Sequence, residues 1–256
     1  MKTTIGFIGG GRITKIFLEG FKNKEKEFDT VIVYEPDSDT FDRLKTLFPE
    51  IRSAATPGES ARADVVIIAV HPPLMMEILD KIAGEITEEK FIVSLAPKIT
   101  IGKIASKLKT ARIVRMIPNA TSYCNEGYNP VAYHDSMLKQ EKKKVRKLFK
   151  PLGKLIETDE HKLEGYAIIS AMLPTYFWFQ WQELENIGVK TGLSPEEAQK
   201  AVKSTLKRAI KLYYNSGLTP EEVMDLIPVK PIGENEAEIK NTLNTKLLGL
   251  FEKIKP

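Results

Sequence analysis

A glycine-rich loop near the N-terminus, Gly6–Thr14, constrains the fold more than any other feature of the chain. The short apolar run Ile5–Ile8 leads into it, and Ile13–Lys22 follows with apolar residues at helical spacing. The order of strand, glycine turn and helix opens the doubly wound α/β folds. The sequence therefore predicts that the chain begins with the first strand and helix of such a sheet.

The loop also matches the dinucleotide fingerprint G-x-G-x-x-G. Gly9 and Gly11 fill the two first glycine positions, and Thr14 supplies a small residue at the third. The first glycine permits a tight turn, and the second lets the backbone approach a diphosphate at the N-terminus of the helix. A plain strand–helix turn is the alternative. We predict a dinucleotide-binding loop whose cofactor contacts are Gly9, Gly10, Gly11, Arg12 and Ile13.

Glu35 closes the second apolar run and is a candidate for binding the adenosine ribose. A carboxylate at that place accepts both ribose hydroxyls and repels a 2′-phosphate, which favours NAD over NADP. Arg12 and Lys15 offer positive charge nearby, so NADP also stays open. The alternative for Glu35 is an ordinary acid in a solvated loop.

Three further segments are expected beyond the carboxyl ends of predicted strands, where ligands of such sheets bind. The alternatives are an exposed loop histidine at His71, turn chemistry at Asn119 and a solvated lysine at Lys98. Lys98 is also a catalytic candidate. The predicted cofactor contacts in these segments are Val70, His71, Pro72, Ala96 and Asn119.

The first half of the chain alternates strand and helix patterns, which implies parallel crossovers and a doubly wound sheet. From about His161 onward the patterns are only helical, with start signals at Ser194–Glu197 and Thr219–Glu222. We therefore predict an N-terminal Rossmann domain at 1–158 and an all-helical dimerisation domain at 159–256. The expected strands are Ile5–Ile8, Val31–Tyr34, Val65–Val70, Phe91–Leu95 and Arg112–Met116, with Val131–Tyr133 and Lys154–Glu157 as two more.

Leu173–Ile187 is apolar and aromatic on nearly all sides. A helix of this kind must be buried on all sides, and a helical tail of this size is barely thick enough to surround it. We expect a second copy of the chain to cover it in a homodimer. Burial against the α/β domain of the same chain is the alternative.

Composition excludes several classes of protein. Lys and Arg number 38 against 34 for Asp and Glu, an excess too mild to indicate nucleic acid. The single cysteine, Cys124, excludes an internal disulfide framework, and the separated His71, His134 and His161 argue against a metal site. Every apolar run is too short to span a bilayer, which takes about 20 residues. We expect a cytoplasmic protein without metal, membrane or nucleic-acid partner.

Several motifs together resemble the pyrroline-5-carboxylate reductase family, and the resemblance extends over nearly the whole chain. It implies a Rossmann domain, an intertwined helical dimer, and hydride transfer from NAD or NADP to a cyclic imine in proline biosynthesis. The family segments I-G-F-I-G-G-G, A-V-K-P, S-x-A-G, R-x-M-P-N-T and G-S-G-P-A-Y are similar to Ile5–Gly11, Ala69–Pro72, Ser94–Pro97, Arg115–Ala120 and Ala171–Tyr176.

The departures from the family lie where the resemblance implies substrate binding. The signature S-P-G-G-T-T is similar to Lys230–Asn235 only in its proline and its second glycine, because Glu234 and Asn235 replace both threonines. Met172 and Leu173 fill positions that serine and glycine leave open. Through this alignment, Glu234 and Asn235 join Lys98 as catalytic candidates, with Glu234 as a proton donor for a carbonyl substrate or, alternatively, as a helix-start acid.

We therefore predict an NAD(P)-dependent oxidoreductase that acts on an imine or oxo compound. A non-catalytic dinucleotide-binding dimer is an alternative, and the loss of both threonines fits it. Reductases related to β-hydroxyacid dehydrogenases or to deazaflavin-coenzyme-dependent NADP reductases are further alternatives. The former place a lysine on the long helix after the Rossmann domain, where this chain offers aromatic residues.

Overall fold

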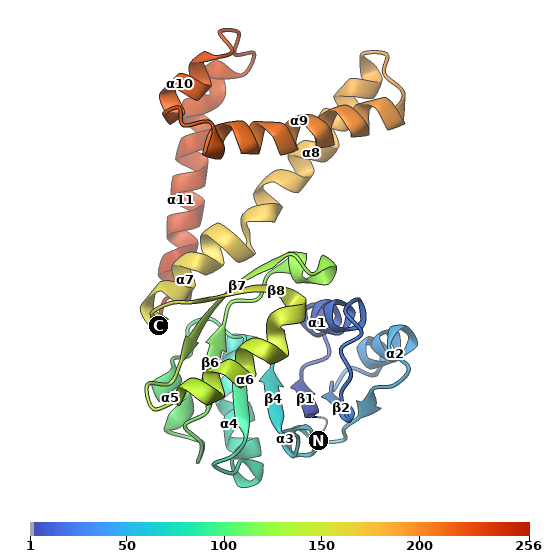
Figure 1. Ribbon diagram of the computed structural model, residues 1–256, viewed down its shortest axis with the longest axis vertical. Coiled ribbons are helices and arrows are strands. Elements are labelled where there is room, and N and C mark those ends of the chain that lie inside the picture. Colours follow the sequence, from blue (N-terminus) through green and yellow to red (C-terminus); the bar gives the residue numbers. More distant parts are fainter. Residues whose placement is uncertain (1–2) are drawn as a thin grey trace. The chain divides into compact units, whose positions relative to one another are not determined.

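The computed structural model describes residues 3–256, and it confirms the predicted α/β class (Figure 1). The chain forms two compact units. One runs up to Ala171 and also takes Leu250–Pro256, and the other is Met172–Gly249. The segment from residue 159 to Ala171 thus groups with the sheet, while the sequence places the domain boundary after residue 158. That boundary stays a prediction about where the two functional domains part.

The first unit contains one eight-stranded sheet with the order β3-β2-β1-β4-β5-β6-β7-β8. The chain order reverses between β1 and β4, which is the topological switch point of a doubly wound fold. The strands are β1 (Thr4–Ile8), β2 (Thr30–Tyr34), β3 (Arg52–Ser53), β4 (Val65–Ile68), β5 (Phe91–Ser94), β6 (Ile113–Met116), β7 (Gly127–Tyr133) and β8 (Gly153–Glu157).

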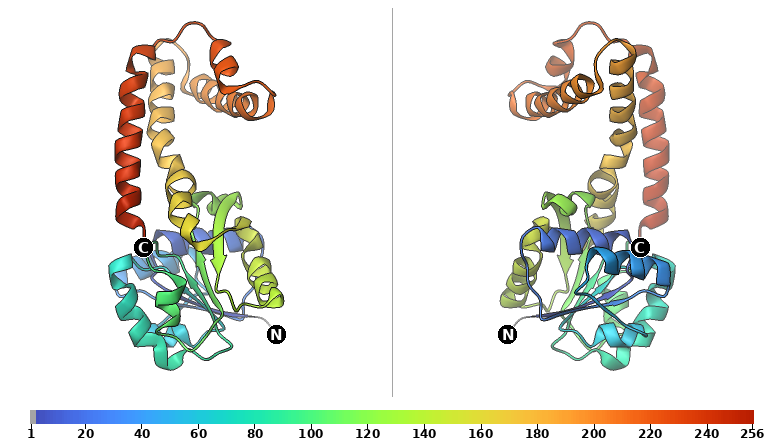
Figure 2. Two further views of the ribbon diagram at one scale, coloured as in Figure 1. Left: turned by 90° about the vertical axis from the view of Figure 1, so that its left-hand side faces the viewer. Right: turned by 90° about the vertical axis from the view of Figure 1, so that its right-hand side faces the viewer.

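Helices lie on both faces of this sheet, and Figure 2 shows α6 and α4 on opposite sides of the strands. Short elements connect them, namely η1 (Pro72–Leu74), η2 (Ala83–Glu85), η3 (Ala120–Cys124), η4 (Lys150–Leu152), η5 (Glu160–Lys162) and the π-helix η6 (Ala167–Ala171). The helices are α1 (Arg12–Lys22), α2 (Ser38–Leu47), α3 (Pro57–Ala61), α4 (Met75–Ile82), α5 (Ile101–Ala105), α6 (Lys139–Phe149) and α7 (Leu163–Tyr166).

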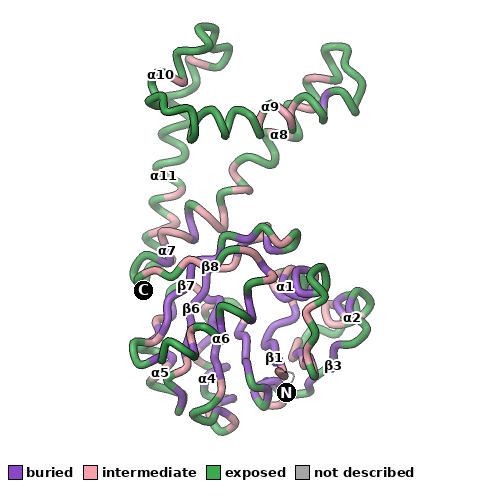
Figure 3. Tube along the Cα trace, in the orientation of Figure 1, coloured by how far each residue is buried: buried purple, intermediate pink, exposed green. Residues whose placement is uncertain are grey.

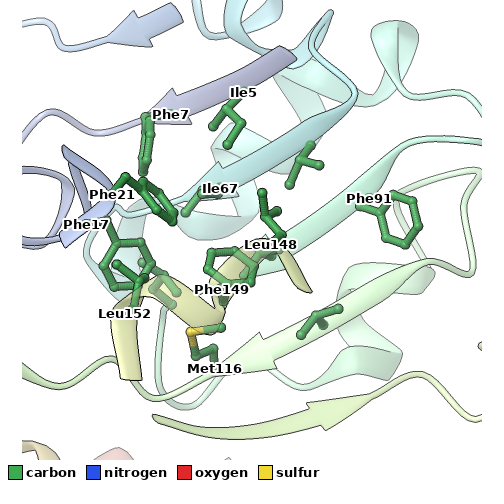
Figure 4. Packing of buried hydrophobic residues seen from close by; sticks show 14 of the residues in the cluster. Ile5, Phe7, Phe17, Phe21, Ile67, Phe91, Met116, Leu148, Phe149 and Leu152 are labelled. Atoms are coloured by element: carbon green, nitrogen blue, oxygen red, sulfur yellow. The ribbon is translucent and has the colours of Figure 1, made fainter. Parts of the chain in front are cut away.

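The main core lies between the strands and the helices α1, α2 and α6 (Figure 4). Phe17 of α1 packs edge to face on Phe149 of α6, with ring centroids 5.9 Å apart. Phe7 of β1 is fully buried in the same cluster. Each such side chain contributes about 1.5–3 kcal/mol by burial. The core therefore fixes α1, and with it the glycine loop, against the middle of the sheet.

The prediction of parallel crossovers is wrong at one strand. β7 pairs antiparallel with β6, with Arg115 opposite Ala132. Only η3 and its flanking turns connect the two strands, and a parallel crossover needs a dozen or more residues. The sequence also misses β3 and α3, because elements of two and five residues are too short to show a hydrophobic period.

The second unit consists of helices, as predicted, and both predicted start signals are capping boxes, at Ser194 and Thr219. Its residues are largely exposed within one chain (Figure 3). Among residues 3–256, no helix combines the length and apolar character that a membrane crossing requires. The unit contains α8 (Leu173–Lys190), α9 (Pro195–Asn215), α10 (Pro220–Asp225), η7 (Gly233–Asn235) and most of α11 (Glu236–Ile254).

Candidate dinucleotide-binding site

The register of the sheet brings the predicted cofactor segments to one edge. Ile8 of β1 lies between Tyr34 of β2 and Ile68 of β4, and Ser94 of β5 lies beside Ile68. These four residues end their strands, all of which are parallel. The glycine loop, Glu35 and the segments after Ile68 and Ser94 therefore leave the sheet side by side at its carboxyl edge, where such folds bind ligands.

Gly9 makes the tight turn that the fingerprint requires. Its φ is +103°, and a Cβ at this position would lie 2.6 Å from the carbonyl oxygen of Ala69. The Gly9 N–H donates to the carbonyl of Tyr34 at 2.8 Å, and the hydroxyl of Thr14 donates to the Gly9 carbonyl at 2.6 Å. The loop is thus tied to β2, β4 and α1, and no residue with a side chain fits at Gly9 without moving it.

Gly11 has the opposite environment, because a Cβ built on it would meet no heavy atom within 4 Å. It is the N-cap of α1, and its lack of a side chain means that no cap hydrogen bond closes that helix end. The first amides of a helix have no partner within the helix. With Arg12 and Ile13 in its first turn, this open corner fits an anionic diphosphate.

Glu35 contacts the glycine loop directly. Its Oε2 accepts the Gly10 N–H at 2.7 Å, and its Oε1 accepts the Asp37 N–H at 3.1 Å. A Cβ on Gly10 would lie 2.9 Å from the Cβ of Glu35, so the missing side chain of Gly10 makes room for the acid. Hydrogen bonds from Thr40 hold the pKa of Asp37 below its ordinary value. Two carboxylates therefore stand at the end of β2, beside the loop.

The other predicted cofactor contacts differ in how they are exposed at this edge. Val70 lies close to the turn, since its Cγ1 would be 3.5 Å from a Cβ on Gly9. His71 is exposed and precedes Pro72 of η1, whereas Ala96 is a buried residue of the loop that follows β5. The structure brings all four to the carboxyl edge.

The polar atoms of Asn119 are already engaged within the chain. Its Oδ1 accepts from the N–H and hydroxyl of Thr121, and its Nδ2 donates to Ser170. Its backbone N–H donates to Asn129. These contacts agree with the alternative of turn chemistry, and cofactor binding by Asn119 stays a prediction.

The three catalytic candidates lie in different units. Glu234 and Asn235 are exposed residues of η7 in the second unit, whereas Lys98 belongs to the first, and their catalytic roles stay predictions. Lys98 lies in the loop after β5, where its φ of +72° is left-handed and its N–H donates to Oε1 of Glu164 at 3.0 Å.

The sequence interpretation missed Glu164, because its partner lies 49 residues away in the chain. Glu164 forms an ion pair with Arg115 of β6. In the sequence, Arg115 attracts notice only as the first residue of the segment Arg115–Ala120, which resembles a family motif. Both side chains are 1% exposed. An arginine inside an otherwise apolar strand is the one signal that points to a buried acidic partner. Within residues 3–256, no three metal-ligating side chains gather into a site.

Comparison with known proteins places this geometry in context. The family described as NADP oxidoreductase coenzyme F420-dependent matches residues 4–98, which contain the glycine loop and the strands up to β5. A pyrroline-5-carboxylate reductase of Corynebacterium melassecola is 22% identical over 97% of this chain and 93% of its own length. The pyrroline-5-carboxylate reductase of Escherichia coli is 25% identical over 89% of this chain and 85% of its own length.

Among solved structures, the pyrroline carboxylate reductase of Plasmodium falciparum, determined with NADP bound, shares the fold with a TM-score of 0.81. It is 23% identical and aligns over 99% of this chain and 97% of its own. The resemblance inferred from the motifs is therefore confirmed by relatives that match both halves of the chain.

Proposed function

We propose that this chain, a divergent member of the pyrroline-5-carboxylate reductase family, is an oxidoreductase that transfers a hydride from a nicotinamide dinucleotide to an imine or related small molecule. The observation that supports this most strongly is the corner at Gly9–Gly11. It combines a constrained turn, an uncapped helix end and open space at Gly11. That combination suits a diphosphate, since a Cβ at Gly11 would meet no heavy atom within 4 Å.

The residues of the chain supply binding and orientation. When bound, the nicotinamide supplies the hydride. Amides at the start of α1 hold the diphosphate, and Glu35 receives the adenosine ribose. Val70, His71 and Ala96 line the side of the edge next to β4 and β5, toward the nicotinamide. An iminium substrate carries its own proton, whereas a carbonyl substrate needs a donor, the role we propose for Glu234 with Asn235 beside it.

Turnover tests this proposal. Purified protein is given NADH or NADPH together with pyrroline-5-carboxylate, other cyclic imines or small oxo acids, and oxidation of the nicotinamide is followed by absorbance. Oxidation that depends on one of these substrates supports the proposal. Cofactor binding without any turnover would instead support a non-catalytic dinucleotide-binding dimer. Oxidation of hydroxy acids with NAD would favour a β-hydroxyacid dehydrogenase, and turnover of a deazaflavin coenzyme would favour the family matched at residues 4–98.

We further propose that the cofactor is NAD in preference to NADP. Glu35 holds its carboxylate at the loop, and Asp37 adds a second one two residues later. Both would face the 2′-phosphate of NADP at short range. Like charges near a protein surface repel by a few kcal/mol at about 4 Å. The relatives' link to NADP is a property of those proteins, and the two acids at the end of β2 set this chain apart from a phosphate-binding loop.

Replacing Glu35 by serine should move the preference toward NADP. We expect the ratio of NADPH to NADH affinity to rise about tenfold, because one repulsive carboxylate and one acceptor for the ribose hydroxyls are lost together. Asp39→Asn, which removes an exposed charge from the first turn of α2, is the matched control and should leave the ratio unchanged. Titration calorimetry with both cofactors measures it. Equal ratios in Glu35→Ser and the unmodified chain would mean that Glu35 does not face the ribose.

The homodimer is part of the same proposal. Helix α8 contains no buried residue within one chain, and Phe177, Trp178 and Phe179 are 41%, 48% and 67% exposed. Exposed aromatic side chains in such a row are typical of an interface between chains. A second copy of this chain covers them in our proposal, since closed two-fold dimers are the commonest oligomers.

A further inference from the structure

Arg115 is the largest of the fully buried side chains described, and it lies on β6 close to the carboxyl edge of the sheet. Two carboxylates bind it. Its Nη2 contacts Oε1 of Glu164 at 2.5 Å, and its Nη1 contacts Oε1 of Glu160 at 2.9 Å. The desolvation of such a group offsets most of what the ion pairs contribute, so the cluster is a poor device for stability alone.

The same two carboxylates also hold backbone amides of the segment that follows β5. Oε1 of Glu164 accepts the N–H of Lys98 at 3.0 Å, and Oε1 of Glu160 accepts the N–H of Ile101, the first residue of α5, at 2.6 Å. Glu164 therefore connects a buried arginine to one particular peptide group. That peptide group belongs to a residue in an unusual conformation.

Lys98 has a φ of +72°, one of three positive values among the non-glycine residues described. A residue with a side chain pays for this conformation, and it persists only where the surroundings determine it strongly. At Lys98 the determining contact is the hydrogen bond to Glu164. The carboxylate is fixed in turn by Arg115, because both side chains are 1% exposed and have no freedom to swing toward solvent.

The loop that Lys98 ends lies beside the cofactor corner. Ser94 is in register with Ile68 of β4, and the N–H of Leu95 donates to the Ile68 carbonyl at 3.1 Å. Ala69, the residue that follows β4, lies against Gly9. A small change in the path of the loop at Lys98 would thus alter the edge against which the cofactor and its substrate must be oriented.

We propose that Glu164 is a positioning residue for hydride transfer, which acts by holding Lys98 in its left-handed conformation, with Arg115 as the group that holds Glu164. This inference rests on the proposed function. Two atoms of the pair, Oε2 of Glu164 and Nε of Arg115, are buried and have no hydrogen-bond partner among residues 3–256. A pair retained for stability would satisfy them, and an incompletely satisfied pair beside a functional edge indicates that geometry is what it provides.

Glu164→Gln tests the proposal, with Glu160→Gln as the matched control. Both substitutions remove one carboxylate from Arg115, but only the first weakens the acceptor of the Lys98 N–H. For Glu164→Gln we expect kcat to fall about 10- to 100-fold with little change in KM, as for other small misplacements of a reacting group. Glu160 is partly exposed, and we expect its variant to change kcat by less than about threefold.

A second comparison separates positioning from general stability. Glycine adopts a φ of +72° without strain, so Lys98→Gly should make the loop less dependent on Glu164. The decrease in kcat that Glu164→Gln causes should therefore be about tenfold smaller when both proteins compared also carry Lys98→Gly. Equal factors in both backgrounds, or equal losses in Glu164→Gln and Glu160→Gln, would overturn the proposal.

Binding of NADH by calorimetry and the melting temperature are measured for every variant. If Glu164→Gln does not fold, Glu164→Asp takes its place, because it keeps the charge opposite Arg115 and shortens the reach to Lys98. The same criteria apply to it. If the unmodified chain binds neither NADH nor NADPH, the proposed function itself is wrong. If it binds and turns over while the variants do not differ, only the role of Glu164 is wrong.

Discussion

Gly11→Val should abolish most of the affinity for NADH while the protein folds as before. A Cβ at residue 11 would meet no other heavy atom within 4 Å, so a small side chain there should disturb the packing little. The same space is where the backbone would approach the diphosphate. We expect affinity to fall about 100-fold, equivalent to about 2.7 kcal/mol, with a melting temperature close to that of the unmodified chain. Calorimetry and thermal denaturation measure the two effects separately.

Gly9→Ala is the informative counterpart, because it should damage folding as well as binding. Its Cβ would lie 2.6 Å from the Ala69 carbonyl, and alanine at a φ of +103° is strained. We expect unfolding to become easier by at least about 1–2 kcal/mol. A Gly11→Val protein that still binds NADH normally would show that no diphosphate lies at this corner, and the proposed function would lose its main support.

The fold class and the resemblance to a reductase family could be predicted because their signals are local. Each strand beside the switch point is a continuous apolar run that is buried on both faces, as in Val65–Ile68, and such runs are hard to mistake. At Gly9 the residue type itself indicates the positive φ that the turn requires. The resemblance to pyrroline-5-carboxylate reductases rests on motifs that extend into the helical half of the chain, and the relatives align over that half as well.

What the sequence could not supply are contacts between distant residues. Glu35 was predicted to face the ribose, but its hydrogen bond to Gly10 depends on how β1 and β2 align. The pairing of Arg115 with Glu164 joins residues 49 positions apart, and no periodicity predicts it. The strand at Val131–Tyr133 was predicted, but its antiparallel direction was missed for a related reason, since the direction of a strand depends on the length and path of its connection.

The apolar pattern of Leu173–Ile187 predicted a buried helix, and within one chain the helix is exposed. The apolar pattern and the exposed helix are compatible if a second molecule packs against the helix and buries it. Exposed aromatic surface of this extent would favour aggregation in a monomer. The sequence rule that apolar helices are buried therefore predicts an assembly here, where it ordinarily predicts the interior of a domain.

Trp181→Glu should convert a dimer into a monomer. A carboxylate among the aromatic residues of α8 has no basic partner supplied for it, and burying an unpaired charge costs several kcal/mol. We expect the dimer dissociation constant to rise at least about 100-fold, since each 1.4 kcal/mol is a factor of ten. Light scattering coupled to size exclusion, at several protein concentrations, measures the mass of both forms.

Gln182→Glu is the matched control, because it adds the same charge to an exposed polar position of the same helix. It should remain a dimer. If the unmodified chain is already a monomer, the homodimer proposal is wrong. If Trp181→Glu stays dimeric, the interface lies elsewhere than on α8, and the exposed aromatic row at Phe177–Phe179 requires another occupant. If only Trp181→Glu loses the dimer, helix α8 makes the contact between the two chains. The added negative charge cannot then be the sole cause, because Gln182→Glu carries the same charge and stays dimeric.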